Sequence, residues 1–243
     1  MQREQGDKKQ SNFVKNRLKV LALLIVVIFP LSLIMYTLKD GRSYAFISML
    51  FVILSIIPFL MIYEMKKPQA REWIPLAVMA ALAAIGRVAF APVPFVKPTS
   101  AIIIITASVF GPEAGFLTGA VSALASNLFF GQGPWTPWQM FSWGIIGFLS
   151  GILTKKNIIN SKAKLYIFGA LTGFIFGWIM NLWTATGYMY EFSWGAFFSL
   201  YISSFIPDLI HSISTVIFLK ILYDPWRAKL KRVKVKFGLI NVE

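Results

Sequence analysis

The sequence predicts an all-α polytopic membrane protein, and three observations support that prediction. Hydrophobic residues make up 57% of the 243 residues, with 22 Phe and 8 Trp, which is far more than the core of a soluble domain requires. The apolar residues gather in eight runs that approach the roughly 20 residues needed to cross about 30 Å of hydrocarbon. Between the runs lie short segments with the charges, glycines and prolines that are typical of span ends.

Two runs, at 20–38 and 44–63, predict two transmembrane helices within residues 18–66. They follow a polar segment, residues 1–17, which we expect to be a cytoplasmic tail. The first run is too long for the core of a signal peptide and is followed by further spans, so we expect no cleavable targeting signal.

Six further runs predict a six-helix membrane core at residues 72–224. They lie at 73–91, 100–110, 114–130, 138–153, 165–185 and 194–223. The run at 100–110 is short, so it should tilt, borrow from its flanks or lie partly inside the protein. Pro30, Pro58, Pro75 and Pro207 fall in or at the ends of predicted helices, where a kink is tolerated if neighbours satisfy the freed carbonyls. Residues 225–243 form a basic tail next to the last run.

The distribution of the 24 Lys and Arg predicts the orientation. If the N-terminus is cytoplasmic, most of them fall on cytoplasmic segments, and the outside holds only Lys39, Arg42 and Lys97. The positive-inside rule therefore predicts a multi-pass protein of the cell membrane with both termini in the cytoplasm. The net charge of +14 is explained by this topology and by attraction to anionic lipid of the bilayer, so no nucleic-acid partner is expected.

Known catalytic motifs are absent from the sequence. There is no cysteine, no H-E-x-x-H, no Walker A loop and no two-histidine metal set, and GFLSG at 147–151 spaces its serine wrongly for G-x-S-x-G. The single histidine, His211, makes a serine–histidine protease hard to build. We therefore expect no enzyme activity, no intrinsic cofactor and no metal site.

Four polar residues lie deep in predicted spans, about 20–24 Å from the cytoplasmic ends at 1.5 Å per residue: Arg87, Asn127, Asn181 and Asp208. Such groups are costly in lipid, so they should face the protein interior or a wet cavity. Arg87 and Asp208 have opposite charges at matching depths and form either a structural ion pair or part of a ligand site. His211, one turn from Asp208, either bonds to Asp208 or faces a ligand.

The predicted external loops are rich in aromatic and amide side chains. One loop combines Trp135, Trp138 and Trp143 with Gln132 and Gln139, and the last loop holds Trp183, Tyr188, Tyr190, Glu191, Phe192 and Trp194. An aromatic belt at the membrane interface explains this composition. A stiff aromatic lid over a planar ligand, oriented by a few amides, explains it as well.

Small residues form a stripe on the predicted helix at 73–91. Ala77, Ala80, Ala81 and Ala84 fall at i, i+3, i+4 and i+7, and they contain two small-xxx-small pairs. Such a stripe lets another helix approach closely, either within this chain or on a partner.

These residues resemble the substrate-binding S-components of energy-coupling factor (ECF) vitamin transporters. That family has a six-helix core whose first helix carries an A-x-x-x-A motif, which falls here on Ala77/Ala81 or Ala80/Ala84. The segment GPEAGFLTGAVSALASNLFFGQGPWTPWQMFSWGIIGFLSG looks like the family's middle helices. The resemblance covers residues 73–223, and the two spans ahead of it depart from the family's plan.

The resemblance implies that the membrane is bacterial. It also implies a subunit that captures a vitamin outside and reorients on docking to a transmembrane coupling subunit, which two separate cytoplasmic ATPases drive. The alanine stripe would contact this partner. The chain looks most similar to members for cobalamin, and riboflavin or another flat heterocyclic vitamin is the second candidate ligand. The residues expected to bind it are Arg87, Asn127, Gln132, Trp135, Trp138, Gln139, Asn181, Tyr188, Asp208 and His211.

Two other classes of function stay open. A self-sufficient ion-coupled carrier would depend on Asp208, the only deep carboxylate, although the sequence shows no convincing inverted repeat. A structural membrane subunit would bind no small molecule.

Overall fold

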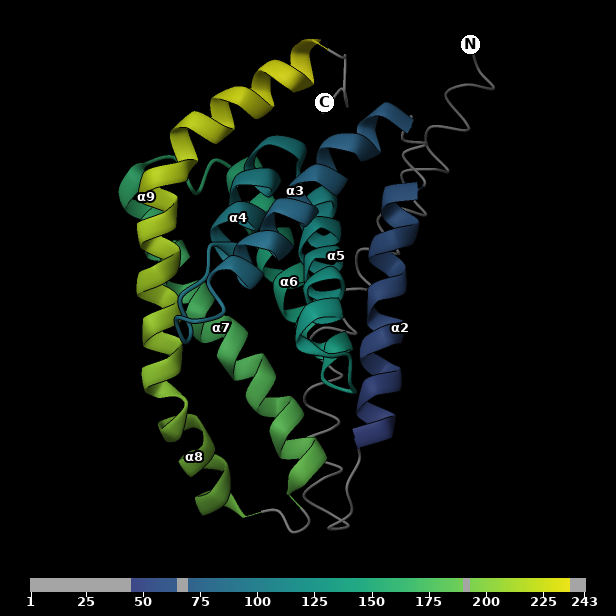
Figure 1. The fold of residues 1–243 in the computed structure, drawn as a ribbon, viewed down its shortest axis with the longest axis vertical. Helices are drawn as coiled ribbons and strands as arrows, with labels where there is room; N and C mark the ends of the chain where they lie inside the picture. The colour runs from purple at the N-terminus through teal and green to yellow at the C-terminus, as the bar shows by residue number, and fades with distance from the viewer. Residues whose placement is uncertain (1–44, 65–69, 190–192, 237–243) are drawn as a thin grey trace.

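The computed structural model describes residues 45–64, 70–189 and 193–236. The predicted first span, at 20–38, lies outside these residues. The described residues form helices and short connections with no strand, which confirms the all-α prediction. In chain order the helices are α2 (Ala45–Glu64), α3 (Ala70–Ala89), α4 (Thr99–Phe110), α5 (Pro112–Phe130), α6 (Thr136–Lys155), α7 (Lys162–Tyr188), α8 (Trp194–Ser203) and α9 (Phe205–Lys236) (Figure 1).

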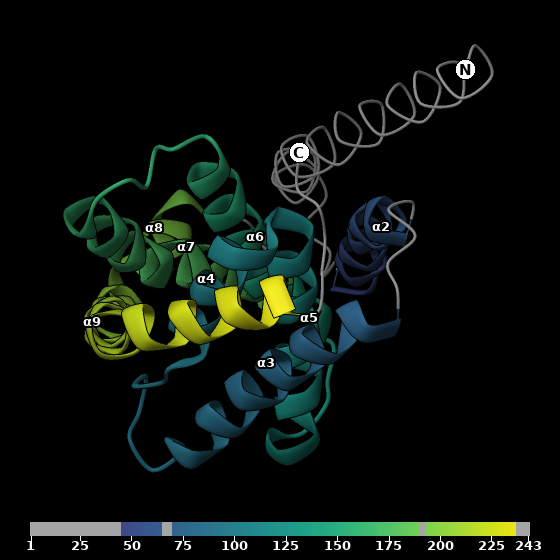
Figure 2. The same ribbon diagram turned by 90° about the horizontal axis from the view of Figure 1, so that it is seen from above.

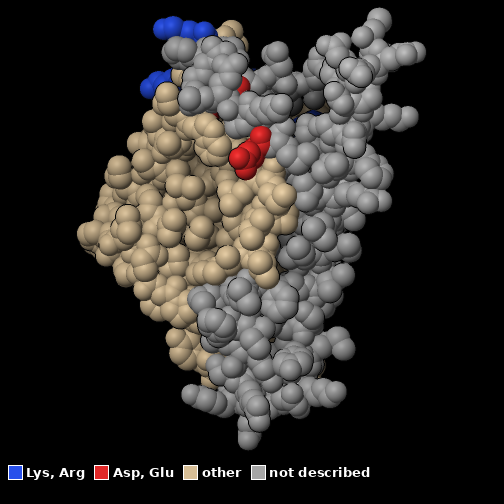
Figure 3. Space-filling model, turned by 90° about the vertical axis from the view of Figure 1, so that its right-hand side faces the viewer, with Lys and Arg blue, Asp and Glu red and all other residues tan. Residues whose placement is uncertain are grey.

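The bundle has the apolar helices and the apolar surface of a polytopic membrane protein. Three described segments are long and apolar enough to cross a membrane: Glu72–Ala89, Lys162–Tyr188 and Trp194–Lys236. Shorter apolar helices lie at Val52–Met61 and Thr99–Phe110. On the described part of one side of the molecule, the visible Lys and Arg and a patch of Asp and Glu lie toward one end, and the rest of that surface carries no charged side chain (Figure 3). Large hydrophobic side chains such as Ile85 and Ile202 are exposed, as expected for lipid-facing positions.

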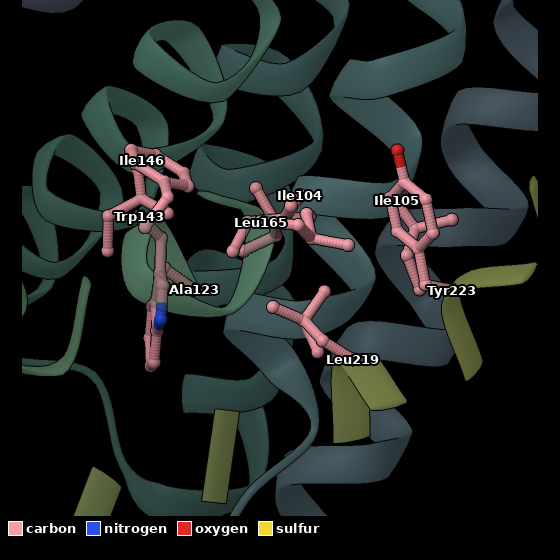
Figure 4. Packing of buried hydrophobic residues seen from close by; sticks show 11 residues of the cluster. Ile104, Ile105, Ala123, Trp143, Ile146, Leu165, Leu219 and Tyr223 are labelled. Atoms are coloured by element: carbon pink, nitrogen blue, oxygen red, sulfur yellow. The ribbon is translucent and has the colours of Figure 1, made fainter. Parts of the chain in front are cut away.

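The short predicted run at 100–110 lies inside the protein. All residues of α4 except Ser108 are buried, so this helix is enclosed by its neighbours instead of facing lipid. Its isoleucines join a core cluster with Trp143 and Ile146 of α6 and Leu219 of α9 (Figure 4). A helix of this length covers only about 18 Å, less than the thickness of the hydrocarbon core. Because neighbouring helices enclose it, it does not need to span the bilayer.

Close contact between α5 and α6 requires glycine. A Cβ atom on Gly119 would collide with the carbonyl of Trp143 and lie 2.8 Å from the backbone nitrogen of Gly144. Because these neighbours are backbone atoms, no side-chain movement makes room. Helix α4 leads into α5 through the single residue Gly111, whose φ of +94° favours glycine.

Helices α7 and α9 meet along a second stripe of small residues. Gly169, Gly173 and Gly177 recur every fourth residue on α7, and a Cβ atom on each would collide with Leu219, Ser212 or Asp208 of α9, respectively. The small-xxx-small rule that identified the alanine stripe describes this glycine stripe equally well.

Helix α2 is packed into the bundle beside α5 (Figure 1). Its residues Val52, Ile56 and Phe59 belong to one core cluster with residues of α5, α6 and α7. The ring of Phe59 stacks on that of Phe116, with 3.9 Å between centroids. The described one of the two additional helices therefore contributes to the core.

The predicted run at 194–223 lies within a candidate span, Trp194–Lys236, but it is not one uninterrupted helix. The chain forms α8 and α9, with a break at Ser204. Pro207 lies in the first turn of α9 and has no backbone N–H to donate to the carbonyl four residues earlier, so the helix cannot run through unchanged. The Ser204 side chain lies at this break, and its Oγ is 3.1 Å from the Tyr201 carbonyl oxygen.

The predicted basic tail continues α9 as far as Lys236. Helix α9 turns sharply, with Pro225 inside it, and its last turns lie across one end of the bundle (Figures 1 and 2). Leu230 and Val233 pack against a core cluster of α2, α3, α4 and α5. The ammonium of Lys234 donates to the carbonyl of Val109 at 2.9 Å, near the end of α4.

Candidate functional site

Arg87 links three helices near the end of α3. Its Nη1 donates to the Ser126 hydroxyl and to Asn127 Oδ1, both at 2.6 Å. Its guanidinium also lies over the rings of Phe130, 4.6 Å from the centroid, and Trp143, at 5.1 Å. Cation–π contacts of this kind stabilise a partly desolvated guanidinium.

Asn127 is the centre of an amide network between α5 and α6. The side chain is fully buried, and its Nδ2 donates to Thr136 Oγ1 at 3.0 Å and to Gln139 Oε1 at 2.8 Å. Thr136 in turn donates to Gln132 Oε1, and Gln132 donates to the carbonyl of Leu124. The network thus holds the connection between α5 and α6 and orients the acceptor that receives Arg87.

Lys97 is fixed to the middle of α9 by its backbone. The Lys97 N–H donates to Ser214 Oγ at 2.9 Å, and the same hydroxyl donates to the Lys97 carbonyl at 3.2 Å. Burial lowers the pKa of the Lys97 ammonium from 10.5 to about 8, and the charge of Arg87 adds to this effect. The connection between α3 and α4 thereby brings a second cation close to Arg87.

His211 of α9 faces α4 and an aromatic wall. Its Nε2 shares a hydrogen bond of 3.0 Å with Ser100 Oγ, which also accepts from the Trp143 indole at 3.2 Å. The imidazole meets the edge of Phe176, and the Phe176 and Trp143 rings lie 4.5 Å apart. Arg87 and Lys97 together with His211, Ser100 and Trp143 form one group, which we call the basic cluster.

Asp208 belongs to a separate polar group. Ser204 Oγ donates to Asp208 Oδ2 at 3.1 Å, and Asn181 Nδ2 donates to Ser204 Oγ at 2.7 Å. The described residues therefore contain no ion pair between Arg87 and Asp208, although the sequence predicts matching depths for them. The partner of His211 is Ser100 instead of Asp208. This group joins α7 to the break between α8 and α9.

The aromatic residues predicted to form a lid are placed differently from one another. Trp138 is 1% exposed in the core cluster that includes α2, and Trp135 packs against the same cluster. Tyr188 is 64% exposed, with its ring edge-to-face to Trp183. Residues 190–192 of the last loop lie outside the described residues. Ligand contact by these side chains stays a prediction, and a packing role accounts for Trp138.

The four alanines of the predicted stripe on α3 divide into two faces. Ala80 and Ala84 are buried within the chain, at 2% and 7% exposure, whereas Ala77 and Ala81 are exposed. Only the pair Ala77/Ala81 is therefore accessible to a partner helix in this conformation. The exposed hydrophobic residues Ile74, Val78 and Ile85 flank it.

Sequence reasoning missed several residues that hold the site together. They are Ser100, Ser126, Thr136, Ser204 and Ser214, whose hydroxyls connect the predicted residues. Single hydroxyls inside apolar runs carry little sequence signal, although Ser214 follows His211 by three residues, on one helix face. Lys97 appeared only as an external charge.

The arrangement is suited to binding polar ligand groups. Within the described ranges no group of three or more His, Cys, Asp or Glu could hold a metal ion. The basic cluster offers cations, an imidazole, hydroxyls and flat aromatic faces, a combination that suits recognition of a small organic molecule.

Comparison with known proteins gives one family and several relatives. The family described as ECF-type riboflavin transporter, S component, matches residues 68–224. A UPF0397 protein of Aliivibrio salmonicida is 33% identical over 113 residues, which cover 42% of this chain and 61% of that protein. UPF0397 proteins of Vibrio atlanticus and Aliivibrio fischeri are 30% and 32% identical, each over 45% of this chain and 66% of the relative. The chain thus covers less than two thirds of the length of these relatives. No solved structure matches it significantly.

Proposed function

Since the chain belongs to the family of ECF-type riboflavin transporter S components, we propose that it is the membrane-embedded substrate-binding subunit of an ECF importer. It captures a vitamin outside the cell and delivers it by docking on a transmembrane coupling subunit, with two separate ATPases supplying the energy. The observation that carries this proposal is the family match over residues 68–224, which coincides with the helices α3 to α9 up to the bend.

The exposed face of α3 supports docking through this helix. Ala77 and Ala81 leave a shallow surface between larger apolar side chains, so a helix of the coupling subunit reaches the α3 backbone closely there. Ala80 and Ala84 serve packing inside the chain in this conformation. We therefore restrict the proposed contact to Ala77/Ala81.

A flat heterocyclic vitamin of the riboflavin type is the ligand that we favour. The family match is to riboflavin transporter S components, and nothing in the comparisons supports cobalamin. Trp138 and Trp143 are both buried in the core, so neither lines a wide, open cavity of the kind a corrinoid needs. A flat ring system needs a smaller binding space than a corrinoid does.

Two measurements on the full-length chain test the proposal. The first is co-purification with a co-expressed coupling subunit and its ATPases, compared between the wild type and Ala81→Trp. The second is retention of riboflavin or cobalamin by the purified protein, measured by absorbance and native mass spectrometry. Failure of the wild type to co-purify with any such module would refute the assignment as an importer subunit. Uptake into vesicles without ATPases would favour the ion-coupled carrier instead.

A further inference from the structure

Two cations in the basic cluster have no acidic partner among the described residues. Arg87 gives its hydrogen bonds to the neutral side chains of Ser126 and Asn127. Lys97 is held by its backbone, and the structure gives its ammonium neither a hydrogen bond nor an ion pair with a described residue. Both charges are largely enclosed, and they repel each other.

The carboxylates of the described residues lie elsewhere. Asp208 accepts from Ser204, and Asp224 pairs with Lys162 near the start of α7. The others stand at helix ends remote from this cluster. They are Glu64 at the end of α2, Glu72 in the first turn of α3 and Glu113 in the first turn of α5. Glu72 precedes Arg87 by about 22 Å along α3 at 1.5 Å per residue.

Unpaired cations in an enclosed, apolar site are costly unless an anion compensates them. Proteins normally place a carboxylate of their own against such charges. No carboxylate compensates Arg87 and Lys97 within the described part of the chain. Their neighbours are hydroxyls, an imidazole and aromatic rings, which are groups that also bind ligands. The start of α4 directly after Lys97 has no side-chain cap, so its helix dipole adds to the positive potential.

Building on the proposed function, we propose that the ligand carries an anionic group, a carboxylate or a phosphate, that binds between Arg87 and Lys97. Asn127 and Ser126 hold the Arg87 guanidinium in place before the ligand arrives, and Ser214 fixes the backbone of Lys97. The rings of Phe130 and Trp143 lie against the Arg87 guanidinium, at 4.6 and 5.1 Å, and form the aromatic surroundings of this site.

Matched ligand pairs test this proposal directly on the purified full-length chain. Riboflavin 5′-phosphate is compared with riboflavin, and pantothenate with pantothenol, because each pair differs mainly in one anionic group. The charged member of at least one pair should bind about tenfold more tightly, which corresponds to ~1.4 kcal/mol. Equal or tighter binding of the neutral members, or no binding of any of the four compounds, would overturn the proposal.

Variants of Lys97 assign the preference to this site. Lys97→Gln should lower the affinity for the charged member more than that for the neutral member and so remove the preference, whereas Lys97→Arg should keep the preference. Lys156→Gln, at an exposed lysine after α6, removes the same charge from the opposite end of the bundle and serves as the matched control. Equal losses for both members in Lys97→Gln would argue for a structural role and against the proposal.

A pH titration of the wild type needs no variant to fold. Lys97 loses its charge above a pKa of about 8, so the ratio of affinities for phosphate over neutral flavin should fall as the pH rises through that value. The ionisable groups facing Lys97 are Arg87 on α3 and His211 on α9, and the phosphate is fully charged in this range. A ratio that stays constant from pH 7 to pH 9.5 would contradict the proposal. Co-purification with the coupling module tests the proposed function separately, because it does not depend on Lys97.

Discussion

Replacing Asn127 by alanine should loosen the centre of the candidate site. The buried amide accepts from Arg87 and donates to Thr136 and Gln139, so the variant loses three side-chain hydrogen bonds at once. Neutral bonds between helices of membrane proteins contribute about 0.6 kcal/mol each. A bond to a charged group contributes about 1.5–3 kcal/mol. The free energy of unfolding should therefore fall by about 3–4 kcal/mol.

Thermal unfolding of the detergent-purified protein measures this loss, which corresponds to a fall of roughly 10 °C in Tm for a chain of this size. Ser122→Ala is the matched control on the same helix. Ser122 is also fully buried, but its hydroxyl bonds only to the Gly119 carbonyl of its own helix, at 2.8 Å. This control should lower Tm by no more than about 2 °C. If Asn127→Ala and Ser122→Ala unfold at the same temperature, the amide network does not hold the site as described.

Four further predictions follow from the packing and from Lys97. Ala81→Trp should abolish co-purification with the coupling module at unchanged Tm. Ala84→Trp should overpack a buried position and lower the free energy of unfolding by about 1–3 kcal/mol or more. The reverse pattern would exclude the exposed face of α3 as the docking surface. Gly119→Ala should push α5 away from α6 and lower the free energy of unfolding by about 1–3 kcal/mol. A Tm equal to that of the wild type would contradict the close backbone contact. Phe59→Ala should lower stability by about 3 kcal/mol, because it removes a fully enclosed ring; no change in Tm would show that α2 is dispensable. Between pH 8 and 10.5 the unfolded chain keeps the Lys97 proton that the folded chain has released, so the free energy of unfolding should rise with pH. Lys97→Met should lose that rise. An identical pH profile for the variant and the wild type would contradict the lowered pKa of Lys97.

Most helix boundaries could be predicted because they depend on local chemistry. Gly111 and Gly131 end helices at positive φ, and the predicted runs agree with the observed helices within a few residues. The break at Ser204 was missed, since hydropathy continues across it and Pro207 suggests only a kink. Whether the short run at 100–110 is tilted or enclosed depends on neighbours that a single run does not reveal.

The candidate site was predictable in depth but not in direction. Counting residues gives the height of Arg87 and Asp208 along the membrane normal, and both heights suggested a pair. It does not give the direction in which each side chain points around its helix. Arg87 faces α5 and α6, whereas Asp208 faces the glycine stripe of α7, so equal height did not produce contact.

The turn in α9 constrains how the whole bundle could rotate in a bilayer. The last part of this helix lies across one end of the bundle, fastened by Lys234 to Val109 and by Leu230 to the core (Figure 2). The predicted topology puts this segment at the headgroup level, where its exposed Lys and Arg would be solvated and attracted to anionic lipid. A rotation about the long axis of this arm leaves those charges at the surface. A rotation about a perpendicular axis in the membrane plane would drive one end of this segment of α9 into hydrocarbon, where its charges are costly. The segment therefore favours tilting of the bundle about its own long axis.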